Sequence, residues 1–153
     1  MTANLNPIYV IGSINTDMVA MTEVLPSPGE TVMGGEFMMT AGGKGANQAV
    51  AAARMGGDVT MIGRLGNDVF ADQSIKRLIS ENINCEFITK DTEKASGVAL
   101  ISVDKNGQNH IVVAPGANAT LTKERLKAVL KQMPDNAIVM MQLEIPLESV
   151  ASV

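Results

Sequence analysis

The most informative segment of the chain is a glycine-rich turn that runs directly into an alanine-rich stretch, over residues 41–56. Three glycines within four residues favour a turn, and the alanines that follow favour a helix. A turn of this kind leaves backbone N–H groups unpaired at the start of the helix, where they can bind a polar ligand. Lys44 and Asn47 lie where their side chains can reach that ligand. The segment therefore predicts a small-molecule site.

Two common nucleotide-binding loops do not fit this turn. A P-loop has Ser or Thr directly after its Gly-Lys pair, whereas Gly45 follows Lys44 here. The dinucleotide-binding loop Gly-x-Gly-x-x-Gly requires a glycine where this chain has Gln48. We therefore expect the turn to hold an uncharged polar ligand. The structural alternative, glycine as a simple break before a helix, stays open at this point.

Three further polar side chains follow predicted strands. Asn15 and Asp17 are two residues apart, so in an extended segment both face the same way. An amide and a carboxylate together can hold adjacent hydroxyl groups. Glu144 ends another apolar run, and ligands of open parallel sheets bind beyond the carboxyl ends of the strands. We expect these groups to converge with Lys44 and Asn47 on a sugar-sized crevice; an ordinary turn at 15–17 and a solvated charge at 144 are the alternatives.

The composition excludes several classes of protein. The 153 residues suffice for one domain with a core, and 46% of them are apolar. A net charge of −4 argues against a nucleic-acid partner. Cys85 and His110 are the only residues of their types, which excludes an internal disulfide and a structural zinc site. The first residues contain no long apolar run, so we expect no membrane partner and a cytoplasmic location.

Periodicity predicts an α/β protein. Short apolar runs predict strands at residues 8–11, 59–62, 86–89, 98–103, 110–113 and 137–143, with extended segments at 19–25 and 30–40. Helices are predicted at residues 43–55, at about 68–81, and from 121 onward with Thr122 as N-cap. Alternating strands and helices imply a parallel sheet, and the hairpin signal Asn106-Gly107 implies a small antiparallel sheet beside it.

The last residues, 145–153, are typical of the first turns of a helix that breaks off within the element. We therefore expect this sequence to be a piece of a longer protein. Whether the piece folds alone is open, because half of a doubly wound sheet leaves one edge strand uncovered.

The glycine-rich segment resembles the signature of the ribokinase-like (PfkB) carbohydrate kinases. Nearly the whole chain shares in the resemblance, through the stretches Gly12–Asp17, Pro28–Thr31, Gly42–Ala53, Ser96–Leu100, Gly116–Ala119 and Met141–Glu144. The Asn-x-Asp, Gly-Gly-Lys-Gly-Ala-Asn-Gln-Ala and Gln-Leu-Glu elements narrow it towards the ribokinases.

This resemblance implies a doubly wound, mainly parallel sheet with a projecting antiparallel β lid. Residues 1–153 would form its N-terminal, sugar-binding part, with lid strands near 18–40 and 85–114. The family's pentose-binding positions correspond to Asn15, Asp17, Gly43, Lys44, Asn47 and Glu144 of this sequence. The Gly42–Gly43 pair matches the family's lid hinge, and Ala99 lies on the lid that closes over the sugar. Lids of two subunits often pack together, so a homodimer is implied.

The activity implied by the resemblance is the ATP-dependent phosphorylation of D-ribose at its terminal hydroxyl, giving ribose 5-phosphate. In the family, the second half of the protein supplies the catalytic Asp, the nucleotide pocket and a monovalent-cation site that would take K⁺. This sequence has no counterpart of that half. Mg²⁺ would bind the phosphates of the ATP. We thus expect no catalytic or metal-binding residue in this chain and no activity of the chain alone. Another sugar or nucleoside kinase, and a non-catalytic sugar-binding or assembly fragment, are the alternatives; a Rossmann dehydrogenase is disfavoured by the missing fingerprint.

Overall fold

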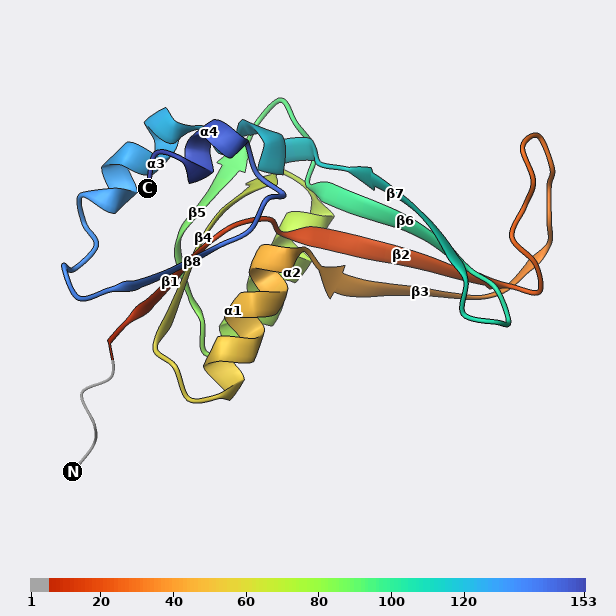
Figure 1. The fold of residues 1–153 in the computed structure, drawn as a ribbon, viewed down its shortest axis with the longest axis horizontal. Coiled ribbons are helices and arrows are strands. Elements are labelled where there is room, and N and C mark those ends of the chain that lie inside the picture. The colour runs from red at the N-terminus through yellow and green to blue at the C-terminus, as the bar shows by residue number, and fades with distance from the viewer. Residues whose placement is uncertain (1–5) are drawn as a thin grey trace.

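Two four-stranded sheets make up the fold, and the computed structural model describes residues 6–153 (Figure 1). Sheet A has the order β5-β4-β1-β8, with strands β1 (Ile8–Ile11), β4 (Val59–Gly66), β5 (Asn84–Asp91) and β8 (Ile138–Met141). Sheet B has the order β3-β2-β6-β7, with strands β2 (Asn15–Thr22), β3 (Gly34–Gly42), β6 (Gly97–Val103) and β7 (Asn109–Ala114). The two sheets share no strand.

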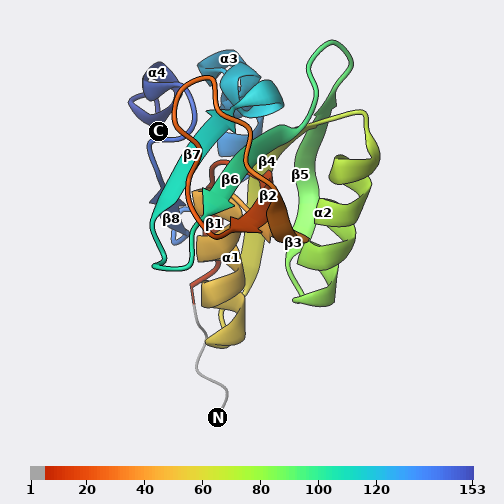
Figure 2. The same cartoon turned by 90° about the vertical axis from the view of Figure 1, so that its right-hand side faces the viewer.

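Sheet A is parallel throughout and carries helices on both faces. Helices α1 (Lys44–Arg54) and α2 (Val69–Ser80) lie side by side on one face in both views (Figures 1 and 2). The 3₁₀ helix η1 (Gly116–Thr120) and the helices α3 (Lys123–Leu130) and α4 (Leu147–Val150) lie at the other face. No helix among residues 6–153 is both long enough and apolar enough to cross a bilayer.

The core of sheet A follows the two-residue period of its strands. Val10 and Met61 pack in the cluster that contains residues of α1 and α2, whereas their neighbours Ile11 and Ile62 pack in the cluster that contains Leu126 of α3. Each of these side chains is at most 1% exposed. A strand that is buried on both faces has apolar residues at successive positions, which explains the continuous apolar segments that predicted these strands.

Sheet B projects from sheet A as a long arm (Figure 1). Its outer pairs, β2 with β3 and β6 with β7, are antiparallel, but the central pair β2–β6 is parallel. The strands of the arm keep many apolar side chains exposed, among them Phe37, Leu100 and Val112. The outer part of the arm therefore carries apolar surface that the described residues leave exposed, whereas Asn15, Thr16 and Ala99 at its base are buried.

The structure confirms the predicted α/β class with a mainly parallel sheet and a projecting second sheet. Two details of the lid prediction are wrong. The segment 85–114 includes β5, which pairs in parallel with β4 and so belongs to sheet A. The projecting sheet is mixed rather than antiparallel, because β6 returns to β2 through a crossover that includes α1, β4, α2 and β5. The predicted helix from Leu121 begins instead at Lys123, with Thr122 at the N-cap position.

Candidate functional site

The sequence-predicted polar residues gather around one cavity at the base of sheet B. Its volume is about 240 Å³. It is lined by Asn15, Asp17, Gly43, Lys44, Asn47, Ala99 and Glu144, and by the apolar residues Ile101, Ile111 and Val113. We call this hollow the front cavity. Seven of the eight predicted site residues line it, and the eighth, Gly42, is the neighbour of Gly43 in the hinge segment.

Glu144 is held at the front cavity by three donors from two different segments. Its Oε2 accepts from Ser13 Oγ at 2.7 Å and from the backbone N of Lys44 at 3.1 Å. Its Oε1 forms an ion pair with the Lys44 ammonium group. Burial raises the pKa of Glu144, but the donors from Lys44 and Ser13 outweigh it and hold the pKa below its usual value. The carboxylate is thus ionised at neutral pH and joins the residues after β8 to the start of α1.

The glycine turn uses its backbone donors differently from the sequence prediction. The N–H groups of Lys44 and Gly45 are accepted by Glu144 and by the Ser13 hydroxyl, and that of Ala46 is accepted by the Ser13 carbonyl at 3.0 Å. The prediction of unpaired N–H groups for a ligand is therefore wrong for these three positions. A ligand in the front cavity meets side chains instead, because the β1–β2 connection has already capped the helix.

Asp17 is the carboxylate of the front cavity that is free to accept hydrogen bonds. None is donated to it among residues 6–153, and its side chain is half-buried. Burial, and next the negative charge of Glu144, raise its pKa above the usual value. Its carboxylate lies directly over Gly42, where a Cβ would fall 2.2 Å from Oδ1. Glycine at position 42 thus leaves the space that this carboxylate occupies.

Asn15 is oriented by a residue that lies 103 positions further along the chain, Asn118 of η1. Asn118 Nδ2 donates to Asn15 Oδ1 at 2.8 Å and to the Ile14 carbonyl at 3.1 Å, while Asn118 Oδ1 accepts from Ile14 N at 2.9 Å. Asn118 is 1% exposed. Because the Asn15 oxygen is already engaged, its NH₂ group is the part that can donate to a ligand in the cavity.

The front cavity therefore combines an open carboxylate, an amide donor and an apolar cover. This set of groups fits a small molecule that carries several hydroxyl groups. The sequence model for pfkB family carbohydrate kinases matches residues 6–151. The chain belongs to the pfkB family of carbohydrate kinases. The membership agrees with the resemblance that the motifs indicated, and it excludes the dehydrogenase alternative.

Several proteins similar to this pfkB-family chain have names that describe them as kinases of a pentose. It is 40% identical to the ribokinase of Schizosaccharomyces pombe over 94% of this chain and 47% of that protein. It is also 40% identical to the deoxyribokinase of Salmonella typhi, over 94% of this chain and 47% of that protein. The solved structure of Arabidopsis thaliana ribokinase with ribose and ATP superposes with a TM-score of 0.78 at 28% identity, covering 96% of this chain and 49% of that one. The chain spans about half the length of these relatives.

The residues of this pfkB-family chain do not form a metal cage. No group of three or more His, Cys, Asp or Glu side chains lies together anywhere in residues 6–153. Asp17 and Glu144 do face the same cavity, but Glu144 is already paired with Lys44. The described residues therefore do not provide the set of oxygen ligands that would hold Mg²⁺ here.

Sequence reasoning missed two groups of site residues in this pfkB-family chain. Ser13 and Asn118 were passed over because their partners are remote in sequence, although both lie in stretches that carry the family motif. The apolar cover formed by Ile101, Ile111 and Val113 was also missed. The two-residue period of β6 and β7 was the available signal, since it places these positions on the same face as Ala99.

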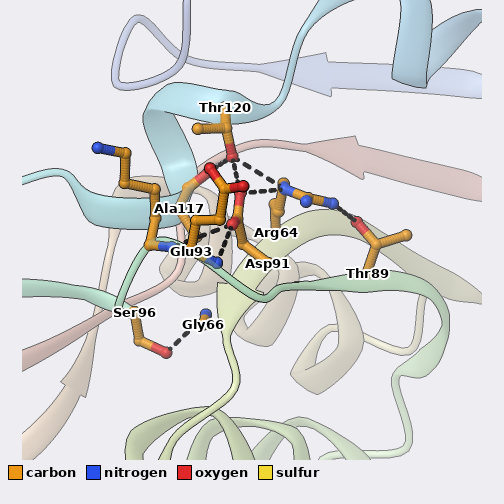
Figure 3. Close-up of polar contacts among 9 residues, drawn as sticks. Arg64, Gly66, Thr89, Asp91, Glu93, Ser96, Ala117 and Thr120 are labelled. Carbon is orange, nitrogen blue, oxygen red and sulfur yellow. Dashed lines mark hydrogen bonds and ion pairs between the residues drawn. The ribbon is translucent and has the colours of Figure 1, made fainter.

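A buried polar network holds η1, and with it Asn118, against sheet A (Figure 3). Arg64 Nε donates to Asp91 Oδ2 at 3.0 Å and to Thr120 Oγ1 at 2.9 Å, and Arg64 Nη1 donates to Thr89 at 3.0 Å. The Thr120 hydroxyl donates to Asp91 at 2.7 Å. Since Arg64 and Asp91 are both 6% exposed, their opposite charges and the threonine hydroxyls compensate for the loss of contact with water.

We expect the Asn118→Asp variant to bind sugar at least about fivefold more weakly, because a lost hydrogen bond of this kind is worth about 1 kcal/mol or more. A carboxylate at position 118 would repel Asn15 Oδ1, so the Asn15 amide would turn its oxygen towards the cavity and remove a donor. Calorimetric titration with ribose measures the change. The exposed Asn136→Asp is the matched control; equal affinity in both variants would contradict the orienting role.

We expect the stability difference between the wild type and Asp91→Asn to shrink as the pH falls below about 4. Hydrogen bonds from Thr120, then from the backbone of Glu93 and Lys94, and from Arg64 hold the pKa of Asp91 far below its usual range. A lowered carboxyl pKa adds stability above the unfolded-state pKa, and this stability is lost as acid protonates the group.

Thermal melts of the wild type and Asp91→Asn at several pH values test this dependence. The exposed Glu86→Gln serves as the control and should follow the wild type throughout. A difference between wild type and Asp91→Asn that stays constant from pH 7 to pH 2 would show that the charge of Asp91 contributes nothing.

Proposed function

We propose that this chain is the sugar-binding part of an enzyme that transfers the γ-phosphate of ATP to the terminal hydroxyl of D-ribose, giving ribose 5-phosphate. The observation that carries the proposal is the front cavity, where an open carboxylate and an oriented amide face the same small space. The ribokinase of Schizosaccharomyces pombe and the deoxyribokinase of Salmonella typhi each act on a pentose, as their names state. A pentose offers the adjacent hydroxyl groups that such a pair can hold.

Each proposed contact follows from the chemistry of its side chain. The Asp17 carboxylate accepts hydrogen bonds from adjacent sugar hydroxyls, and the Asn15 amide donates to one of them. Asn47 and the ion-paired Lys44 and Glu144 bound the polar end of the cavity. Ala99 and its apolar neighbours on sheet B cover the sugar and exclude water. The pair Gly42–Gly43, at the base of β3, is the proposed hinge for this cover.

We further propose that ATP, Mg²⁺ and a monovalent cation such as K⁺ are held by parts of the enzyme outside these 153 residues. ATP would supply the phosphoryl group, while this chain binds and orients the sugar. The solved relative with ribose and ATP spans about twice the length of this chain, which supports the division. By this proposal no side chain described here is the catalytic base, and the chain alone is inactive. Its use of ATP favours a cytoplasmic location.

A homodimer through sheet B is part of the proposal. The face of the arm away from the front cavity keeps four large apolar side chains between 49% and 65% exposed, namely Phe37, Met39, Leu100 and Val112. Such a surface on a projecting sheet is costly in water, and a second copy of the same sheet would cover it. Sedimentation of the chain at several concentrations tests this, and a monomer at all of them would contradict it.

Two alternatives remain distinct from ribose phosphorylation. The similarity to a deoxyribokinase favours a kinase for a different sugar, because the same identity connects the chain to both relatives. The half-length match favours a non-catalytic sugar-binding or assembly fragment. The affinities of the chain for ribose, 2-deoxyribose and a nucleoside distinguish a ribose site from a site for a different sugar. Sugar binding without phosphate transfer, in a chain that is never part of a longer polypeptide, would favour the second.

The testing experiment is a thermal melt of the 153-residue chain with and without saturating sugar. A ligand at about 100 times its dissociation constant adds about 2.7 kcal/mol to the free energy of unfolding, which is readily measured. We expect ribose to raise the melting temperature and glucose to leave it unchanged. A cooperative melt that no pentose shifts would overturn the sugar site, and ribose-dependent ATP hydrolysis by the chain alone would overturn its inactivity.

A further inference from the structure

A second hollow lies behind the front cavity, between α1, α2 and the end of β3. Its volume is about 310 Å³, and a smaller hollow of about 180 Å³ shares Thr40, Ala41, Ser74 and Arg77 with it. We call the two together the rear cleft. The two helices that bound it run side by side, with β3 beside them (Figure 2). It lies on the side of sheet A away from α3 and α4.

The floor of the rear cleft contains a serine hydroxyl that makes no hydrogen bond within the described residues. Ser74 is 6% exposed, and no hydrogen bond joins its hydroxyl to any other group in residues 6–153. The residue lines both hollows of the cleft. Ser74 Oγ is not enclosed, since the fully buried side-chain atom without a partner among residues 6–153 is Gln142 Oε1, so a ligand in the cleft can reach the hydroxyl and hydrogen-bond to it. The floor thus offers a hydrogen bond that the protein itself does not use.

The rim of the rear cleft carries an excess of positive charge. Arg54 of α1 and Arg77 of α2 both line the cleft, and their side chains are 59% and 56% exposed. Both guanidinium groups pair with the same carboxylate: Arg54 Nη2 lies 2.6 Å from Glu81 Oε1, and Arg77 Nε lies 3.5 Å from it. Arg54 also donates from Nε to Glu81 Oε2 at 2.8 Å, so both of its fork donors are used. The longer contact leaves Arg77 able to bind an anionic group.

The remaining wall of the rear cleft is apolar. Val50 is the half-buried apolar residue of this wall, and the core side chains of Ile14 and Leu78 lie behind it. This arrangement matches a compact molecule that has an apolar body and one acidic group. The guanidinium group can bind either a carboxylate or a phosphate monoester, since both anions accept hydrogen bonds from its two parallel N–H donors.

We propose that the rear cleft binds a small organic anion. Its acidic group would pair with Arg77, its body would pack on Val50, and one of its polar atoms would bond to Ser74. The cleft shares Asn15 and Asn47 with the front cavity and includes Gly42 at the base of β3. An occupant would therefore touch residues that the proposed sugar site uses, and it would change the affinity for sugar. This second consequence rests on the proposed function.

Calorimetric titration of the 153-residue chain with phenyl phosphate, benzoate and inorganic phosphate tests the binding. We expect phenyl phosphate or benzoate to bind more tightly than inorganic phosphate, because the apolar body adds contact area. Arg77→Gln should weaken the organic anion about tenfold, the effect of losing one charge-assisted hydrogen bond. Ser74→Ala should weaken it less. The exposed Arg125→Gln on α3 is the matched control and should leave binding unchanged.

A second measurement locates the anion without any substitution. Amide chemical shifts in the wild-type chain should change at residues 74 and 77 and at 40–42 when the anion is added. Absence of binding, equal weakening in Arg125→Gln, or shift changes confined to other regions would overturn the rear cleft as a site.

The effect on sugar affinity separates this proposal from the proposed function. With the anion bound, the ribose dissociation constant should change by the same factor by which ribose changes that of the anion. Anion binding in a chain that never binds ribose would contradict the proposed function and support the cleft. Ribose binding without anion binding would do the opposite. Binding of both with no mutual effect would overturn the coupling.

Discussion

The Gly43→Ala variant is expected to lose more than about 2 kcal/mol of stability, together with its affinity for sugar. Gly43 has φ of +92°, a region that L-residues with a side chain rarely adopt. A Cβ at this position would lie 2.7 Å from the Ser13 carbonyl oxygen, 2.8 Å from Asn15 N and 2.9 Å from the Ile14 Cα. All three are backbone atoms next to the front cavity, so they can yield only if the β1–β2 connection moves. Urea unfolding followed by circular dichroism measures the loss.

Gly56→Ala is the matched control for this prediction. Gly56 has nearly the same φ, +89°, but a Cβ there would meet no atom within 4 Å. It therefore carries the backbone strain alone, which costs about 1 kcal/mol. If both variants lost the same stability, the close approach of Gly43 to residues 13–15 would contribute nothing to the loss in Gly43→Ala. A Gly43→Ala variant that binds ribose normally would also remove Gly43 from the proposed site and hinge.

The Asp17→Asn variant is expected to bind ribose about tenfold to about 100-fold more weakly, yet to melt at a higher temperature without ligand. The affinity falls because the amide replaces a charged acceptor of sugar hydroxyls. The stability rises because burial and the charge of Glu144 raise the pKa of Asp17, so the ionised carboxylate destabilises the folded state at neutral pH. Stabilisation by removal of a functional charge is a common feature of binding sites.

The pH dependence of the melting temperature tests whether the charge of Asp17 destabilises the folded chain. A carboxyl group whose pKa is raised by folding destabilises the protein above that pKa, and the cost disappears once acid protonates it in both states. The gain in melting temperature of Asp17→Asn should therefore be full at pH 7 and vanish below about pH 4. The exposed Asp135→Asn serves as the control. An Asp17→Asn chain that melts lower than the wild type at pH 7, or that binds ribose as well, would contradict the assignment.

The sequence by itself determined the fold class and most of the candidate site. Asn15, Asp17, Lys44 and Glu144 were found because each follows a strand or a glycine turn, and a parallel sheet brings such ends to one edge. The α1 helix needed little more than its alanines and the glycines at both ends. These features are local, so the period and type of neighbouring residues suffice to predict them.

The tertiary structure alone decided how the groups of the site are paired. The sequence left the N–H groups of the α1 turn open to a ligand, but Ser13 and Glu144 accept them, and Glu144 approaches from 100 residues away. The same holds for Asn118, which fixes the amide of Asn15. It also holds for β5, which pairs with β4 instead of joining the lid. Local pattern shows which residues can donate, accept or form a strand. Partners so remote in sequence are chosen by the packing of the whole chain, because a buried polar group is stable mainly where that packing brings a hydrogen-bond partner to it.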